Sequence, residues 1–168
     1  FWRHVPVMKK QGNAFLARDR IRNETFHFFE QGMKRLVIEL ELDHLVVYLV
    51  HLALGGRARH RQLNSLYDLV KKTAKPCVVA GDFNALWGER EIDLFLAATG
   101  LKSANSANLP TFPSDNPHRN LDFILYSDKI EPRKFSIPQV AYSDHLPLVV
   151  DFDVQIENDL RKASRITR

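Results

Sequence analysis

Two strand-like segments between residues 35 and 54 restrict the fold of this chain most. In "RLVIELEL" (35–42) apolar residues occupy every second position from Leu36 to Leu42, as in a strand with one buried face. The next segment, "LVVYLVHLAL" (45–54), is apolar on both faces, which is typical of a strand buried on both sides. Only Asp43 and His44 separate the two, so we expect a tight hairpin that places the second strand inside a sheet.

The rest of the chain indicates two helices and several more strands. Apolar residues recur at helical spacing over residues 63–70, before Pro76, and again in "EREIDLFLAATG" (89–100), where Gly100 is a suitable end. Strands are therefore expected to predominate, in an α+β fold with two packed mixed β-sheets flanked by helices. The remaining expected strands are "GNAFLARD" (12–19), "TFHFFE" (25–30), "KPCVVAGDFN" (75–84), "LDFILYS" (121–127) and "SDHLPLVVDFDV" (143–154).

Composition fits one globular domain, because 168 residues with 45% hydrophobic content are enough for a single core. Cys77 is the only cysteine, so no disulfide can form within the chain, and its apolar strand favours a buried structural thiol over a reactive one. No apolar run approaches the roughly 18 residues of a membrane span, and nothing resembles a signal peptide. The compartment stays open, and a cytoplasmic location is the one we expect.

Positive charge is concentrated near the C-terminal end. The net charge is +4, and residues 157–168 carry four basic residues against two acidic ones. We therefore divide the chain into a domain over residues 1–154 and a basic C-terminal tail over residues 155–168. The mild basic excess permits an anionic partner, such as nucleic acid or phospholipid, without selecting one.

Polar residues stand where several of the expected strands begin or end. In "VVAGDFNALWGE" (78–89), Asp82 and Asn84 are two residues apart at the end of a buried strand, so both side chains should point the same way. Charged groups are seldom buried without partners, which makes such positions candidates for a site. The other members of this set are His51, Asp122, Asp144 and His145.

Four of these six residues also have a structural interpretation. His51 could be a hydrogen-bonded core histidine, and Asp82 could be a turn or helix-cap residue. Asp144 could belong to a turn before a strand, and Asp122 could pair with Arg119. Because all of them stand at comparable places at the edge of the core, we favour a shared site.

If these side chains converge, their chemistry suits hydrolysis of a phosphate ester. Oxygen ligands are those that Mg²⁺ and Mn²⁺ prefer, and both ions bind phosphate oxygens. An Asp–His pair gives a polarised imidazole that can act as a base or donate to developing negative charge. An asparagine amide can hold water or a phosphate oxygen without adding repulsion.

Three motifs in this order resemble the endonuclease/exonuclease/phosphatase superfamily, in its deoxyribonuclease I-like form. They are "GDFNA", "LDFILYS" and "SDHLPLVVDF", preceded by "VHLAL". Because "GNAFLARD" and "TFPS" also resemble segments of this family, the resemblance covers roughly residues 12–154. It implies a four-layer α/β/β/α sandwich and a metal-dependent phosphoesterase.

The resemblance also implies roles for individual residues. Asp82 is similar to the acid that orients or deprotonates the attacking water, and Asn84 to the amide that steadies the water and the phosphate. Asp144 resembles an acid close to the metal, so these three residues are the implied ligands of Mg²⁺ (or Mn²⁺).

The remaining residues are implied to act on the phosphate. His145 resembles an imidazole that contacts the phosphate, and Asp122 the carboxylate that orients it. His51 resembles the second histidine of the deoxyribonuclease and sphingomyelinase branches. Thr111, from "TFPS", is a further candidate for contact with the phosphate.

One part of the family pattern has no counterpart here. Relatives begin with a strand that carries an Asn, and a later strand carries the Glu that is their principal Mg²⁺ ligand. In this chain, Glu24, Glu30 and Glu39 come too late in the order of motifs to replace that Glu. Either the upstream part is missing or the ligand has been lost, and the non-methionine start at Phe1 favours the first explanation. The first strands of the sheet would then be missing, so we expect an uncovered sheet and self-association through it.

Two classes of function follow. The first is a Mg²⁺-dependent hydrolase of phosphate esters or phosphodiesters, and the alternative is a non-catalytic domain that binds phosphate or a partner and has lost the metal-ligand glutamate. The substrate stays open among nucleic acid, a phospholipid head group and a small phosphodiester. "GGRARHRQ" (55–62) and "DNPHRN" (115–120) are candidate nucleic-acid contacts, although the first also fits the solvated face of a helix.

Overall fold

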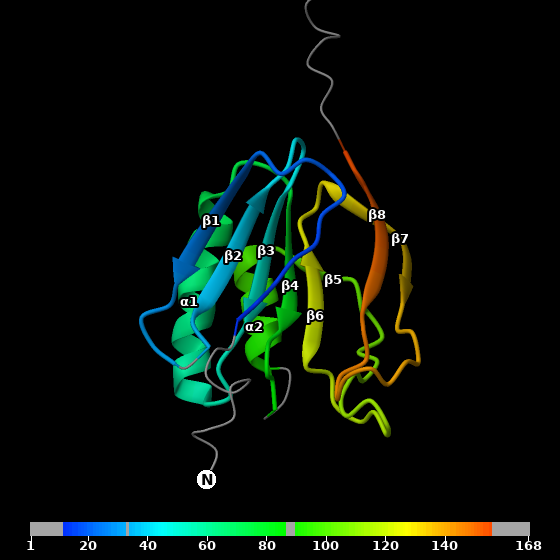
Figure 1. Cartoon of the computed structure of the whole chain (residues 1–168). Helices are drawn as coiled ribbons and strands as arrows, with labels where there is room; N and C mark the ends of the chain where they lie inside the picture. Colours follow the sequence, from blue (N-terminus) through cyan, green and yellow to red (C-terminus); the bar gives the residue numbers. More distant parts are fainter. Residues whose placement is uncertain (1–11, 33, 87–89, 156–168) are drawn as a thin grey trace, which may run out of the picture.

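A six-stranded mixed sheet forms the centre of the structure (Figure 1). The computed structural model describes residues 12–32, 34–86 and 90–155. Strands β3 and β4 are parallel, and every other neighbouring pair is antiparallel. The strands lie in the order β1 (Asn23–Phe28), β2 (Leu36–Glu41), β3 (Val46–His51), β4 (Cys77–Asp82), β6 (Asp122–Tyr126) and β5 (Lys102–Ser103).

The predicted hairpin is confirmed as β2 and β3, with Ile38 opposite Leu49. The amide of Leu42 donates to the carbonyl of Leu45 over 2.9 Å and closes the turn. The single buried face expected of β2 is wrong, because Val37 is fully buried in the main core while Ile38 and Leu40, which point to the opposite face, are buried as well. Strand β3 lies inside the sheet between β2 and β4, as predicted.

Two helices cover one face of this sheet (Figure 1). Helix α1 (Gly56–Lys72) connects β3 to the parallel strand β4 and buries Leu63, Leu66 and Val70. Helix α2 (Arg90–Thr99) follows β4 and is closed by Gly100, whose φ is +78° and whose amide donates to the carbonyl of Leu96. Both predicted helices are therefore confirmed, and they enclose the main hydrophobic core.

The alternation of side chains along the central strands decides where the polar residues lie. Val50, Val79 and Phe123 belong to the core beneath the helices. Since successive side chains of a strand point to opposite faces, residues one or three positions away from these must face away from the helices. At the ends of β3, β4 and β6 these residues are His51, Asp82 and Asp122.

A second sheet lies beside β6 (Figure 1) and consists of β7 (Ile130–Ser136) and β8 (Val149–Val154). The two strands are antiparallel, with a register shift between Pro132 and Lys134. The α+β class with two sheets and helices outside is confirmed, and the described residues form the helical layer, the larger sheet and the smaller sheet. Residues 156–168, which make up most of the expected basic tail, lie outside the described residues.

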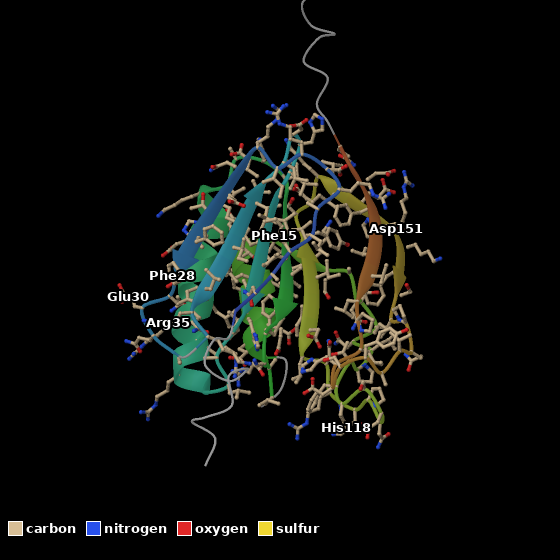
Figure 2. The ribbon with its side chains drawn as sticks, in the orientation of Figure 1. Phe15, Phe28, Glu30, Arg35, His118 and Asp151 are labelled. Atoms are coloured by element: carbon tan, nitrogen blue, oxygen red, sulfur yellow. The ribbon has the colours of Figure 1, made fainter. Side chains whose placement is uncertain are left out.

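One predicted strand is wrong: "GNAFLARD" has no strand among its described residues. This segment crosses the helix-free face of the large sheet, where Figure 2 shows Phe15 in front of the strands. The side-chain Nδ2 of Asn13 donates to the backbone carbonyls of Leu36 (3.1 Å) and Leu49 (3.4 Å). These side-chain hydrogen bonds take the place of those that strand pairing would otherwise supply. Within the described ranges, no helix is long and apolar enough to cross a membrane.

Candidate active site

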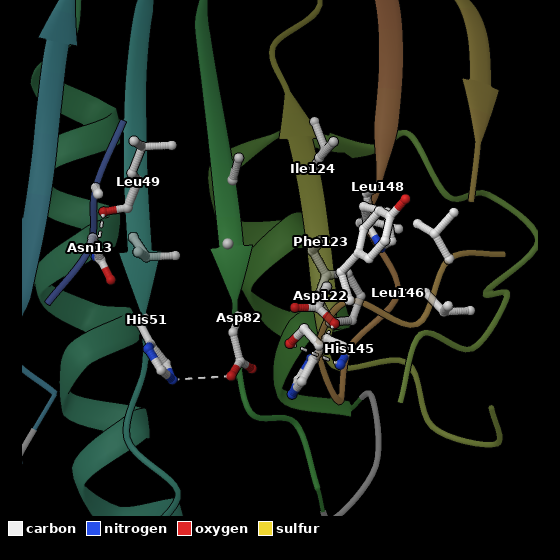
Figure 3. Close-up of a pocket in the computed structure, with 18 residues that line it drawn as sticks. Asn13, Leu49, His51, Asp82, Asp122, Phe123, Ile124, His145, Leu146 and Leu148 are labelled. Atoms are coloured by element: carbon white, nitrogen blue, oxygen red, sulfur yellow. Dashed lines mark hydrogen bonds and ion pairs between the residues drawn. The ribbon is translucent and has the colours of Figure 1, made fainter. Parts of the chain in front are cut away.

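Three neighbouring strands bring His51, Asp82 and Asp122 to one edge of the large sheet (Figure 3). The parallel pairing of β3 and β4 sets His51 beside Asp82, and the antiparallel pairing of β4 and β6 sets Asp82 beside Asp122. Backbone register alone therefore gathers three residues that are far apart in the sequence, and all three face away from the helices.

Asp82 forms the first of two Asp–His pairs. Its Oδ2 lies 3.1 Å from His51 Nε2, and its Oδ1 accepts a hydrogen bond of 2.8 Å from the backbone amide of Asn84. Burial acts to raise the pKa of Asp82. The hydrogen bonds from His51 and from the Asn84 backbone amide act in the opposite direction, as do the charges of His51 and His145. Together they hold the pKa of Asp82 below its usual value. Asp82 is therefore an anion at neutral pH that can accept a proton or orient water.

The glycine before Asp82 makes this pairing sterically feasible. Gly81 has a φ of +143°, and a Cβ at this position would lie 1.9 Å from the carbonyl oxygen of Val50 on β3. No other residue type fits so close to a neighbouring backbone. Gly81 thus allows the approach of β3 that sets His51 against Asp82.

Asn84 lies near Asp82, but not for the reason that the sequence suggested. Strand β4 ends at Asp82, and Asn84 adopts a φ of +50°, so the alternation of an extended strand does not reach it. Its side chain is only 3% exposed, and Nδ2 donates to the carbonyl of Leu52 over 2.8 Å. The inference from strand spacing is wrong, although Asn84 does line a pocket with Asp82.

Asp122 and His145 form the second pair. His145 Nδ1 lies 2.7 Å from Asp122 Oδ2, and the hydroxyl of Thr111 donates to the same oxygen over 2.6 Å. Because an ionised carboxylate only accepts hydrogen bonds, Nδ1 carries the proton and Nε2 is left as the available nitrogen. Burial raises the pKa of Asp122, and its two donors offset this only in part. The ring of Phe112 packs against the imidazole, with 4.8 Å between centroids.

Thr111, expected as a contact of the substrate phosphate, contacts Asp122 instead. It is fully buried, donates to Asp122 and does not line either of the pockets at the site. In the structure it therefore helps to fix the carboxylate that orients His145.

Asp144 is exposed in the loop before β8. Its Oδ1 accepts a hydrogen bond of 3.0 Å from the hydroxyl of Ser143, and its carbonyl accepts one from the amide of Ser114. It lines the same pocket as Asp82 and Asn84. The implied metal ligands thus share a pocket, although only one of them is held rigidly within a strand.

The donor set suits a hard cation but is sparse. Within the described ranges, no three His, Cys, Asp or Glu side chains are grouped so that they could hold a metal ion. Two carboxylates and one amide would leave most of the coordination positions of Mg²⁺ to water and substrate, as is common for this ion. The residues present fit a weakly held, largely hydrated Mg²⁺.

Two adjoining pockets meet at these side chains. One, of about 550 Å³, extends over the helix-free face of β3, β4 and β6. The other, of about 530 Å³, lies at the strand ends and includes Asn84, Asp144 and Lys34. Lys34 was not expected from the sequence, where a lysine before a strand gives no sign of its neighbours. Both pockets are lined by His51, Asp82, Asp122 and His145.

A family model described as the endonuclease/exonuclease/phosphatase family matches residues 2–145. The chain belongs to this family. The activities in that description have in common the hydrolysis of a phosphoester bond. A UPF0294 protein of Vibrio cholerae serotype O1 is 29% identical over 152 residues, which is 88% of this chain and 47% of the relative. The chain thus spans about half the length of this curated relative.

Solved structures of two enzymes share the fold. The mannosyl-6-phosphatase of Bacteroides thetaiotaomicron has a TM-score of 0.60 at 14% identity, over 80% of this chain and 67% of that one. The catalytic domain of human nocturnin, solved with a bound sulfate anion, has a TM-score of 0.58 at 24% identity, over 80% of this chain and 60% of that one.

Proposed function

We propose that this chain carries part of the active site of a hydrolase that cleaves phosphate esters or phosphodiesters. The observation that carries the proposal is the convergence of two Asp–His pairs, Asp82–His51 and Asp122–His145, on two adjoining pockets. Family membership supports the reaction class, and the two pairs supply the groups that water attack requires.

The environments of the two pairs support different roles. Asp82, whose pKa is lowered, would orient the attacking water and accept its proton while His51 and the Asn84 amide hold its carboxylate. His145, whose Nδ1 is engaged by Asp122, would present Nε2 to the phosphate. A proton on Nε2 would donate to the oxygen that gains negative charge.

Mg²⁺ or Mn²⁺ is the metal proposed for this site, with Asp82, Asn84 and Asp144 as the residues of this chain that would hold it. When bound, the ion would neutralise charge on the phosphate. Since the chain spans 47% of the Vibrio relative, the activity is proposed for a protein of that relative's length that includes this chain, called the longer protein below. This 168-residue chain, with so sparse a donor set, is expected to bind Mg²⁺ weakly and to turn over slowly.

The proposed substrate is defined by its phosphate group. A sugar phosphatase and a sulfate-bound catalytic domain among the structural neighbours support recognition of a tetrahedral anion. Nucleic acid, a phospholipid head group and a small phosphodiester are the candidates, and a screen of such esters with the longer protein and Mg²⁺ would separate them.

The substitution Asp82→Asn in the longer protein tests the proposal. Loss of a positioned acid or base typically costs about two to four orders of magnitude in turnover, and we expect a loss in this range. Asp151→Asn is the matched control, because Asp151 is exposed on β8 (Figure 2) and lines neither pocket. Activity of Asp82→Asn within a factor of about three of wild type would contradict the role of Asp82. Wild-type protein that binds phosphate esters without cleaving them would favour a non-catalytic binding domain.

A further inference from the structure

Lys34 holds a distinctive place in the pocket at the strand ends. Among the described residues that line this pocket it is the sole lysine or arginine, and it shares the lining with Asp82, Asp122 and Asp144. A lone ammonium in a pocket lined by three carboxylates would be expected to pair with one of them. Within the described ranges, however, Lys34 forms no ion pair with Asp or Glu.

The contact that Lys34 does make conflicts with the first Asp–His pair. Its Nζ contacts His51 Nε2, the same nitrogen that lies 3.1 Å from Asp82 Oδ2. One ring nitrogen cannot accept a hydrogen bond from an ammonium while donating one to a carboxylate. The two contacts of His51 Nε2 are therefore alternatives, and an anion that drew Lys34 away would leave His51 free to donate to Asp82.

The backbone of Lys34 is held in place by one buried side chain. Gln62 on α1 is 1% exposed, and its Nε2 donates to the carbonyls of Gln31 (2.9 Å) and Lys34 (2.7 Å). Its Oε1 accepts a hydrogen bond of 2.8 Å from the amide of Ala53, two residues after His51. The segment that carries Lys34 and the segment after His51 are thus fixed to the same amide group, so the lysine stem starts from a defined position.

We propose that Lys34 binds the phosphate group of the substrate, exchanging its contact with His51 for one with a phosphate oxygen. This inference rests on the proposed function, since it assigns a binding residue to the same site. A positive charge at this position offsets the repulsion between the phosphate and the nearby carboxylates. Exchange of partners also couples substrate binding to the orientation of His51 toward Asp82.

Titration of the 168-residue chain with inorganic phosphate, in buffer free of divalent ions, tests the assignment. A hydrogen bond that involves a charged group is worth about 1.5–3 kcal/mol, so Lys34→Met should weaken phosphate binding by about ten- to hundredfold. Lys34→Arg should retain most of the affinity. Arg35→Met is the control, because Arg35 is the adjacent residue in the chain and is exposed (Figure 2). Equal thermal unfolding midpoints would exclude a merely structural effect.

A second readout follows His51 directly. In wild-type protein, added phosphate should change the ¹⁵N shifts of the His51 ring toward the form protonated at Nε2, as Lys34 leaves it. In Lys34→Met the ring should have this form before phosphate is added, so phosphate should change the shifts little. Phosphate affinity unaltered in Lys34→Met, or no phosphate binding by wild type, would overturn the assignment of Lys34.

Failure of this assignment can be told apart from failure of the proposed function. In the longer protein with Mg²⁺, Lys34→Met should raise KM for a phosphate ester and lower kcat/KM. Hydrolysis with an unchanged KM in Lys34→Met would overturn the role of Lys34 and leave the hydrolase intact. Phosphate binding that depends on Lys34, in a protein that hydrolyses no ester, would support the binding residue and contradict the hydrolase.

Discussion

The two faces of the six-stranded sheet have opposite characters. On the helical face, Val37, Tyr48, Val79 and Leu125 are at most 2% exposed and form one continuous core. On the opposite face lie the polar strand ends and a pocket of about 550 Å³, and further out Phe26 and Phe28 on β1 are 49% and 69% exposed. One face is filled to stabilise the fold, whereas the other leaves space in which chemistry can take place.

Adjacent residues can therefore serve entirely different purposes. Asp82 faces the pocket, while Phe83 is fully buried and packs edge-on against Phe95 and Phe123 at centroid distances of 6.5 and 5.3 Å. The comparison implies that changes on the helical face alter stability, and that changes at the strand ends alter activity.

The largest effect is expected from Gly81→Ala, because this position serves both faces. The new Cβ would overlap the carbonyl oxygen of Val50, and the backbone φ of +143° at Gly81 suits only glycine. We expect loss of cooperative folding in thermal melts and loss of phosphate binding together. Gly55→Ala is the control, because a Cβ at Gly55 meets nothing within 4 Å and alanine at a helix N-cap costs only about 1 kcal/mol. A folded Gly81→Ala that binds phosphate would disprove the strand spacing described above.

The second prediction concerns the core. Removal of a buried phenylalanine typically costs about 3–5 kcal/mol, so Phe83→Ala should lower the free energy of unfolding in urea by this amount. Asp82→Asn, one residue away, should change it by no more than about 1 kcal/mol, since asparagine has the same shape and its Oδ1 can still accept the hydrogen bond from the Asn84 backbone amide. Equal destabilisation by the two variants would contradict the division between the faces.

The third prediction treats Asp122 and His145 as one unit. If Asp122 acts by orienting His145, the variant with both residues changed to alanine should be little less active than His145→Ala alone. Turnover of the longer protein, measured in a double-mutant cycle, tests this. Losses that multiply fully would show that the two residues act separately.

The smallest effect concerns the open face. We propose that the chain self-associates through β1, an edge strand that displays Phe26 and Phe28 on the helix-free side. Light scattering after gel filtration should show concentration-dependent dimers that Phe28→Ser weakens. Leu94→Ser is a matched control, since Leu94 is 63% exposed but lies on α2. A chain that is monomeric at all concentrations, or an equal response to Leu94→Ser, would contradict the proposal.

Much of the fold could be predicted because alternation and helical spacing are local properties. Strands β2 and β3 follow from the pattern before and after Asp43, and α2 from its apolar stripe and Gly100. Strand β7 was missed because Glu, Pro, Arg and Lys occupy most of its positions, so no alternation is visible. "GNAFLARD" has the composition of a strand, but side-chain bonds from Asn13 to the sheet take the place of strand pairing.

The site was predictable only in part. Asp82 and Asp122 stand at strand ends, where a carboxylate beside apolar residues is conspicuous in the sequence. The position of Asn84 depends on a φ of +50°, and that of Lys34 depends on hydrogen bonds from the distant Gln62. Such contacts arise from tertiary structure, and no local pattern encodes them.

The central position of β4 has a consequence for how the protein folds. Its pairing with β3 requires the 17-residue helix α1 to form the crossover, and its pairing with β6 requires closure of the long connection that contains α2. Loop closure must occur before such distant pairings become favourable, so they form slowly. In refolding, the helical circular dichroism should therefore recover before phosphate binding, and the capacity to bind phosphate should be among the last properties that the chain regains.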